Sequence, residues 1–214
     1  MTSEIAEERR SGGQAGERLG DGQTAARLSG GHTVARLSGG HIVERLSGAQ
    51  VAALADALGD LLVDAVDDGA SVGFLAGLDR ESAARWWRDR APDVTAGRVA
   101  TWAVRDGERL TGTVSLAHAD KPNARHRAEL VKLLVHRDAR GKGFGRSLLA
   151  LAEREAARSG VTLLLLDTRT DSPAESLYAS AGWTRLGVVP GHAADPAGAL
   201  CPTTYFYKLL VHTT

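Results

Sequence analysis

The sequence predicts an α/β protein, a mixed sheet with helices on both faces. Apolar segments at 128–135 and 161–168 flank a glycine-rich turn and an amphipathic segment that ends at Arg158. This order of strand, turn, helix and strand implies a parallel strand pair with a right-handed crossover. Alternating apolar segments on either side of the unit are typical of antiparallel hairpins.

Length and composition favour one folded domain with an extension. The 214 residues are 43 % hydrophobic and 24 % charged, as in soluble globular proteins. Lys+Arg and Asp+Glu both number 26, so net charge does not direct the chain to nucleic acid or a membrane. The charged start lacks an apolar signal region, and no apolar run is long enough to span a bilayer. Cys201 is the only cysteine, which excludes an internal disulfide. We expect a cytoplasmic protein.

Residues 1–44 are predicted to be a flexible N-terminal extension, disordered over its first 17 residues. A nine-residue unit that begins with Arg-Leu occurs four times, mostly with helix-breaking glycines. Each copy offers one or two aliphatic side chains, too few for a core. His32 and His41 share one repeat position, but a metal site would need further ligands, so a duplicated flexible segment is favoured. The folded domain is therefore expected over 45–214.

Two helices are predicted at the start of this domain. Apolar residues recur at helical spacing over 49–66, with Ser47 as a plausible N-cap. A second helix is expected over 80–91, capped by Asp79 and ended before Pro92.

Some side chains on these helices allow two interpretations. Trp86 and Trp87 are expected to pack their helix onto the domain, with stacking on a ligand as the alternative. Asp60, Asp64 and Asp67 lie at helical spacing and favour a solvated face, although they could also attract a cationic amine.

Strands and one short helix are predicted for the rest of the domain. The apolar run at 161–168 is typical of a strand buried on both faces. The last two strands are expected to be joined by an irregular loop at 191–202. The other expected elements are a hairpin at 98–119 that turns at Asp106-Gly107, a helix capped by Ser172 with Pro173 at its first position, and strands at 183–190 and 203–211.

The turn at 137–147 has the composition of an anion site, because glycines before a helix gather backbone N–H groups at the helix N-terminus. A nucleotide triphosphate loop would need a hydroxyl residue after Lys142, where Gly143 stands. A dinucleotide fingerprint would need a third glycine at the position of Arg146. Neither of these two patterns fits.

A third pattern fits. Arg140-x-x-Gly143-x-Gly145 resembles the R/Q-x-x-G-x-G/A signature of the GNAT superfamily of N-acetyltransferases. The likeness runs from about residue 48 to residue 210, and stretches such as AESLYASAGWTRLGVVPG are similar to the branch that contains tabtoxin-resistance acetyltransferase. The resemblance implies the acyl-CoA N-acyltransferase fold, in which two central parallel strands splay apart. It also implies acetyl-CoA (coenzyme A) as cosubstrate, and we expect no metal.

The resemblance implies that the pantetheine arm lies in the gap between the splayed strands and that the Val135 N–H donates to the thioester oxygen. Backbone N–H groups of the turn close on the pyrophosphate, because glycines leave the approach free of Cβ atoms. The cofactor-binding residues expected are Leu133, Leu134, Val135, Arg140, Gly141, Lys142, Gly143, Phe144, Gly145, Arg146 and Ser147.

Acetyl transfer to an amine needs a base, because an alkyl amine has a pKa of about 10. Glu129 and Asp167 are carboxylates in otherwise apolar strands, where the pKa of an unpaired acid is open to tuning. The resemblance points to the same two positions, and which carboxylate is the base stays open. The alternatives are an ion pair with a nearby arginine for Glu129 and a turn cap for Asp167. By resemblance, Tyr178 protonates the leaving thiolate; otherwise it is a core tyrosine.

The expected function is an N-acetyltransferase that acts on a small-molecule amine, with toxins and antibiotics among the candidates, by direct transfer in a ternary complex. The alternatives are acetylation of protein amines and a non-catalytic acyl-CoA sensor. Cys201 has no motif around it to suggest an acyl-cysteine intermediate. Residues 70–78, His192 and Tyr205 are expected to wall the acceptor site. We expect no nucleic acid or membrane partner and leave a homodimer open.

Overall fold

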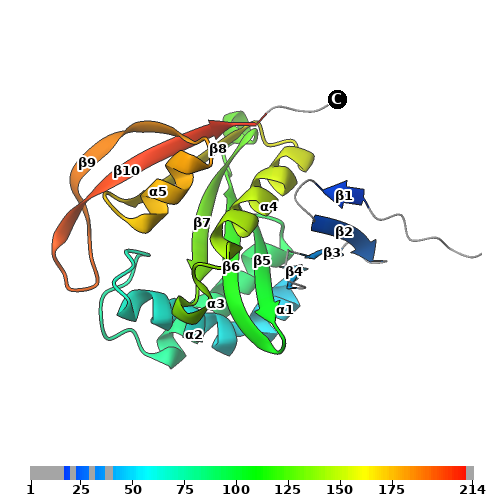
Figure 1. Ribbon diagram of the computed structural model, residues 1–214, viewed down its shortest axis with the longest axis horizontal. Helices are drawn as coiled ribbons and strands as arrows, with labels where there is room; N and C mark the ends of the chain where they lie inside the picture. Colours follow the sequence, from blue (N-terminus) through cyan, green and yellow to red (C-terminus); the bar gives the residue numbers. More distant parts are fainter. Residues whose placement is uncertain (1–16, 20–22, 29–31, 37–40, 211–214) are drawn as a thin grey trace, which may run out of the picture.

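The computed structural model describes residues 17–19, 23–28, 32–36 and 41–210. Helices cover both faces of a central sheet, with α4 and α5 on one face and α1, α2 and α3 on the other (Figure 1). This arrangement confirms the expected α/β class. The helices are α1 (Gly48–Ala53), α2 (Ala55–Asp67), α3 (Arg80–Thr95), α4 (Phe144–Arg158) and α5 (Pro173–Ser180), with short 3-10 turns at Pro122–Ala124 and Arg137–Ala139.

The sheet is mixed. Among the described residues its strands lie in the order β1-β2-β3-β4-β5-β6-β7-β8-β10-β9, and every neighbouring pair is antiparallel except β7 and β8. The expected parallel pair with antiparallel flanks is therefore confirmed. The strands are β1 (Glu17–Leu19), β2 (Gln23–Leu28), β3 (His32–Arg36), β4 (Ile42–Leu46), β5 (Val99–Asp106), β6 (Arg109–His118), β7 (Arg127–Val135), β8 (Leu163–Arg169), β9 (Thr184–Ala194) and β10 (Leu200–Leu209).

The parallel pair separates early. β7 and β8 pair only from Arg127 to Glu129 on the β7 side, although β7 continues to Val135. Beyond Glu129, the edge of β7 that faces β8 has no strand partner in the described part of the chain. The predicted splay of the two central strands is thus present.

The core has one apolar cluster on each face of the sheet. Leu148, Leu151 and Phe206 belong to the cluster under α4 and α5. Leu58 and Trp87 belong to the cluster under α1, α2 and α3. In the described residues no helix has the length and apolarity needed to cross a lipid bilayer.

The helical predictions need two corrections. The helix expected over 49–66 is broken at Leu54, whose φ of −96° and ψ of 8° separate α1 from α2. The helix expected to end before Pro92 continues to Thr95. Proline removes one helical hydrogen bond there, but the last turn is kept by bonds such as that from the Ala96 N–H to the Pro92 carbonyl, 2.9 Å.

The loop expected at 191–202 is mostly strand. β9 and β10 form a long hairpin that curves away from the rest of the sheet (Figure 1). Its turn is built by Asp195, whose carboxylate accepts from the Ala199 N–H at 3.0 Å while its carbonyl accepts from the Gly198 N–H at 2.9 Å. The Asp-Pro-Ala-Gly sequence at 195–198 is the turn signal that the sequence reading missed.

Strands also occur within the nine-residue repeats. β2, β3 and β4 each begin at the sixth or seventh position of successive repeat units, and they pair antiparallel from β1 through to β5. Residues 1–16, where disorder was expected, lie outside the described residues. The β4 side chain of Val43 is completely buried, between Trp102 and other core residues of the sheet. We therefore propose that the folded domain starts with β4, three residues before the expected boundary at residue 45.

Val43→Ala should lower the free energy of unfolding by about 2 kcal/mol, because two buried methyl groups are lost and a cavity remains. Urea denaturation at unchanged m-value measures this loss. The matched control is Ile42→Ala, since the Ile42 side chain is 42 % exposed and should change stability much less. Equal, small effects of both variants would show that β4 is peripheral to the domain.

Candidate active site

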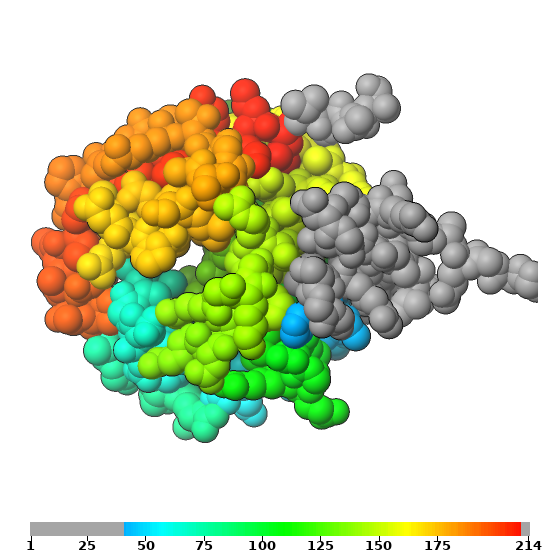
Figure 2. Space-filling model, in the orientation of Figure 1, coloured from blue at the N-terminus to red at the C-terminus, as the bar shows by residue number. Residues whose placement is uncertain are grey.

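The separation of β7 and β8 coincides with a hollow in the surface. Figure 2 shows an opening bounded by α5, by the segment that follows α2, and by the turn after β7. The unpaired edge of β7 from Leu133 to Val135 runs toward that turn. Within the part of the chain that the structure describes, no strand takes up the backbone groups along this edge, and only the Val135 carbonyl is bound by a side chain, that of Arg140. The edge is the position expected for the pantetheine arm.

The turn after β7 has the geometry of an anion site. Gly141 and Gly143 have φ of 75° and 82°, values that side-chain-bearing residues rarely adopt. α4 begins directly after Gly143 without a side-chain cap and without an acidic residue in its first turn. Its first N–H groups are therefore left for a ligand, and the helix dipole favours a negative one.

Two of the three expected cations already have partners. The Arg140 Nε donates to the Val135 carbonyl at 3.2 Å, and the Arg140 guanidinium also pairs with Asp68, which lowers the pKa of that carboxyl. Arg146 donates to the Ser180 hydroxyl at 2.7 Å and so ties α4 to α5. In the described part of the chain no hydrogen bond or ion pair engages Lys142, which is exposed. Lys142 is therefore the cation best placed to meet phosphate, while Arg140 braces the turn.

The structure brings Glu129 and Asp167 to one end of the gap. Glu129 is the last β7 residue paired with β8, opposite Leu165, and Asp167 lies two residues further along β8. Neither carboxylate has a hydrogen bond or an ion pair within the described residues, so the structure shows neither an arginine pair nor a turn cap. The pKa of Glu129 is raised, first by burial and then by the Asp167 charge, while Lys132 and Arg127 oppose the rise. Glu129 thus has the environment of a general base.

Tyr178 projects from α5 into the core beside the gap. Its ring is 6 % exposed and lies 5.9 Å from Trp183 and 6.1 Å from Phe206, measured between ring centroids. Burial, and then the charge of Asp167, raise the pKa of the Tyr178 phenol. Both effects disfavour the phenolate, so the phenol stays protonated at neutral pH.

The expected walls of the acceptor site meet beyond the carboxylates. Tyr205 pairs with Asp167 between β10 and β8, and its hydroxyl lies 2.9 Å from the His192 Nε2. The segment between α2 and α3 reaches the same hairpin, because the Ala76 N–H donates to the Pro196 carbonyl at 2.7 Å. The β9–β10 hairpin and the segment between α2 and α3 thus meet near this end of the gap.

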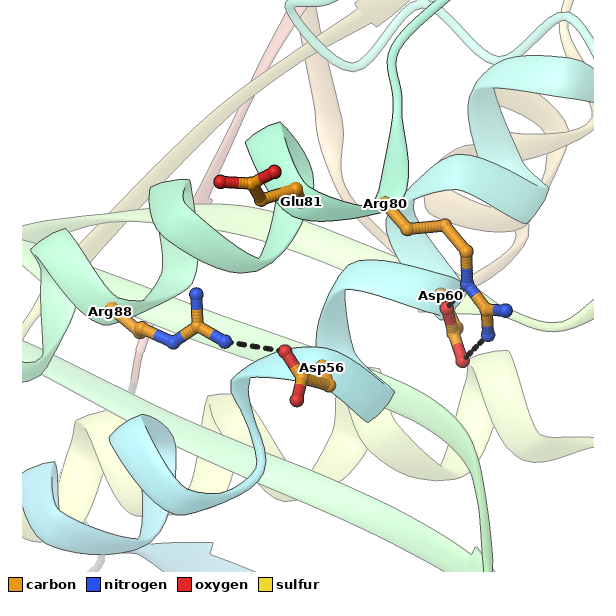
Figure 3. Close-up of a pocket in the computed structure, with 5 residues that line it drawn as sticks. All are labelled: Asp56, Asp60, Arg80, Glu81 and Arg88. Carbon is orange, nitrogen blue, oxygen red and sulfur yellow. Dashed lines mark hydrogen bonds and ion pairs between the residues drawn. The ribbon is translucent and has the colours of Figure 1, made fainter.

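The aspartate row of α2 lies elsewhere. Figure 3 shows Asp60 paired with Arg80, and Asp56 paired with Arg88, on the outer side of α2 and α3. The depression they line has a volume of about 290 Å³, and none of the expected site residues lines it. Asp64 accepts from the Arg137 backbone N–H at 3.0 Å. Asp60 and Asp64 thus bind arginines of the chain itself and are not directed at an acceptor amine.

Lys132 is a residue of this region that the sequence reading did not single out. Its Nζ donates to the Val72 carbonyl at 2.9 Å and lies 5.0 Å from the Trp86 ring centroid. A charged residue inside an apolar strand was the available signal. Trp87 is buried, as expected for packing, whereas Trp86 is half-buried beside Lys132.

His41, one of the two repeat histidines, has a packing role. The His41 ring stands edge-on to Phe144 with 4.6 Å between centroids, and its Nδ1 lies 3.8 Å from Asp106. Within the described ranges, His, Cys, Asp and Glu side chains do not gather in threes as metal ligands would.

Comparison with known proteins agrees with this geometry. Residues 64–183, more than half of the chain, match the model of the acetyltransferase (GNAT) family. The chain belongs to this family. Membership confirms the expected fold and an acetyl-CoA-dependent acetyltransferase as the class of enzyme.

Individual GNAT relatives are distant. N-acetyltransferase 8F1 of Rattus norvegicus is 29 % identical over 121 residues, which are 53 % of this chain and 55 % of the rat protein, so the match spans about half of that relative. The ribosomal-protein-alanine N-acetyltransferase of Brucella melitensis has 24 % identity and a TM-score of 0.63, covering 78 % of this chain and 99 % of its own. The yncA protein of Salmonella typhimurium, solved with its cofactor acetyl-CoA, has 20 % identity and a TM-score of 0.63 over 81 % of this chain and 96 % of its own.

Gly143→Asp should weaken acetyl-CoA binding about 100-fold or more, because a carboxylate would enter the anion site and a side chain would be forced to positive φ. Isothermal calorimetry with acetyl-CoA measures the change. Gly160→Asp is the matched control, since Gly160 has φ of 87°, open space around its Cβ position, and lies past the other end of α4. Undiminished affinity in Gly143→Asp would exclude this turn as the cofactor site.

Proposed function

We propose that the protein transfers the acetyl group of acetyl-CoA to a primary amine of a small molecule, with both substrates bound together. The observation that carries the proposal is the pair of unpartnered carboxylates, Glu129 and Asp167, at the end of the gap where the pairing of β7 and β8 stops. Two carboxylates in this position attract a cationic amine and can take up its proton. A non-catalytic acyl-CoA sensor would leave both of them without a role.

The proposed mechanism gives each residue one step. Glu129, with its raised pKa, accepts the proton of the bound ammonium, and Asp167 holds the amine by its charge. Acetyl-CoA supplies the thioester, whose carbonyl carbon bonds to the amine nitrogen as the C–S bond breaks. The Val135 N–H is assigned to the carbonyl oxygen, where negative charge develops. Tyr178 donates its proton to the departing sulfur, and the second proton that the nitrogen loses on becoming an amide passes through solvent to the Tyr178 oxygen.

The contacts between the segment that follows α2 and the β9–β10 hairpin support a small molecule over a protein. The segment between α2 and α3 is bonded to the β9–β10 hairpin through Ala76 and Pro196, and the Ser71 hydroxyl lies 3.5 Å from the Ala194 carbonyl. An extended polypeptide would have to open these contacts. Acetylation of a protein amine is the second candidate. The likeness to the ribosomal-protein-alanine N-acetyltransferase of Brucella melitensis favours it.

A thiol-release assay with acetyl-CoA tests the proposal against a panel of alkyl amines, amino acids, amine-bearing antibiotics and a peptide with an N-terminal alanine. At least one small amine should be acetylated with a kcat/KM about tenfold or more above that of the peptide. Release with the peptide alone would replace the small-molecule proposal by the protein one.

Two tyrosine variants control this assay. Tyr178→Phe should lower kcat about 100-fold and leave acetyl-CoA affinity nearly unchanged, because only the proton donor is removed. Tyr207→Phe, on β10, should retain the wild-type rate. Full turnover by Tyr178→Phe would remove that hydroxyl from the mechanism.

Asp167→Asn should move the acidic limb of kcat/KM to lower pH. The Asp167 charge raises the pKa of Glu129, so its removal lets Glu129 ionise at lower pH and act as a base there. Profiles for both enzymes are measured with the same amine, so that the ionisation of the substrate contributes equally. A limb that stays in place or moves to higher pH would contradict the coupling.

A further inference from the structure

Lys132 joins the sheet to the segment between α2 and α3, residues 68–79, here named the connector. Its Nζ donates to the carbonyl of Val72, in the connector, at 2.9 Å. The same ammonium lies 5.7 Å from the ring centroid of Phe74 and 5.0 Å from that of Trp86. These two rings meet edge to face with 5.8 Å between centroids. The Lys132 side chain of β7 thus contacts a backbone carbonyl and an aromatic ring of the connector and a second ring from α3.

A bulge in β7 directs Lys132 to that wall. The register with β6 passes from Val131 opposite Ser115 to Leu134 opposite Thr113, so β7 has one extra residue here, and Lys132 has φ of 53°. Regular alternation would have placed residue 132 on the face of Leu130, in the core under α4. The bulge therefore redirects the ammonium from an apolar core to the connector.

The connector fits closely around this ammonium. Gly73 has φ of 90°, and a Cβ atom added to it would lie 3.9 Å from the Lys132 Nζ. The backbone of the connector therefore passes close to the charge. The other end of the connector is bonded to the β9–β10 hairpin through the Ala76 N–H. Ser71 and Ala76 thus bind the connector to the hairpin, and Lys132 binds it to the central part of the sheet.

Lys132 lies within the electrostatic reach of the candidate site. Burial first, and then the Arg90 charge, lower the pKa of Lys132, while Asp167 and Glu129 act in the opposite direction. The ammonium therefore shares one environment with the two carboxylates assigned to the acceptor amine. Its hydrogen bond and its charge are already engaged by the connector, so it is suited to holding a wall and not to moving a proton.

We propose that Lys132 is a positioning residue for the acceptor: it holds the connector against β7 and so fixes the wall opposite Glu129 and Asp167. The assignment rests on the proposed acetyl transfer to an amine. It concerns acceptor binding, because, among the described residues, the Lys132 ammonium makes its hydrogen bond and ring contacts with the connector and α3 and none with the anion site.

Hydrogen–deuterium exchange tests whether Lys132 holds the connector in place, and it needs no acceptor substrate. Lys132→Met keeps the stem and removes the donor and the charge, so amides at 70–78 should exchange about tenfold faster while those of α4 are unchanged. Lys132→Arg should restore protection, and Lys121→Met, at an exposed loop lysine, should match the wild type. Unchanged exchange in Lys132→Met overturns the proposal. Faster exchange spread equally over α4 also overturns it, since it would show general destabilisation.

Kinetics with the best amine of the panel supply the second test. Lys132→Met should raise the KM for the amine about tenfold and change the KM for acetyl-CoA less than twofold, with recovery in Lys132→Arg. A parallel rise of both KM values, or an unchanged KM for the amine, overturns the assignment. If no amine on the panel is acetylated, the proposed function fails, and hydrogen–deuterium exchange alone decides whether Lys132 holds the connector.

Discussion

The early separation of β7 and β8 is the constraint on which the site depends. Backbone N–H and C=O groups need partners, and a central strand normally finds them on both sides. Past Glu129, β7 has lost the partner on one side, so that edge can serve an extended ligand. The same separation sets the ends of the site: the turn before α4 lies where β7 finishes, and the two carboxylates lie where the pairing stops. Cofactor and acceptor are thereby assigned to two ends of one gap.

The features that the sequence predicted well are local. The glycine turn, the strand–helix–strand order and the helix cap of α5 depend on residues close together in the chain. Ser172 does accept from the Glu175 N–H at 3.2 Å, and Pro173 does begin the helix. The positions of Glu129 and Asp167 were also accessible, because a carboxylate in an apolar strand is conspicuous without knowledge of its neighbours.

The features that were missed depend on distant partners. β4 was hidden in a glycine-rich repeat, since only pairing with β5 shows that Val43 is buried. Arg140 was expected to add charge around the pyrophosphate, but Asp68, far away in sequence, holds its guanidinium. The aspartates of α2 were expected to form a solvated face, yet Asp60 and Asp64 have arginine partners that come from α3 and from the turn after β7. Helical spacing shows which side chains share a face, but it does not show what that face meets.

The bulge at Lys132 was also missed, and it too depends on residues that are distant in the sequence. The segment AELVKLLV has the composition of a regular strand, in which Glu129 and Leu134, five residues apart, would face opposite sides. Their partners on β6, Ala117 and Thr113, are four residues apart, so the bulge places both on the face of α1, α2 and α3. A lysine at positive φ costs about 1–2 kcal/mol. A hydrogen bond and two aromatic contacts compensate that strain, and they do so only because the connector is present to receive the ammonium. The contacts with the connector therefore help to maintain the irregular shape of β7, and the residue pattern of β7 alone could not have predicted it.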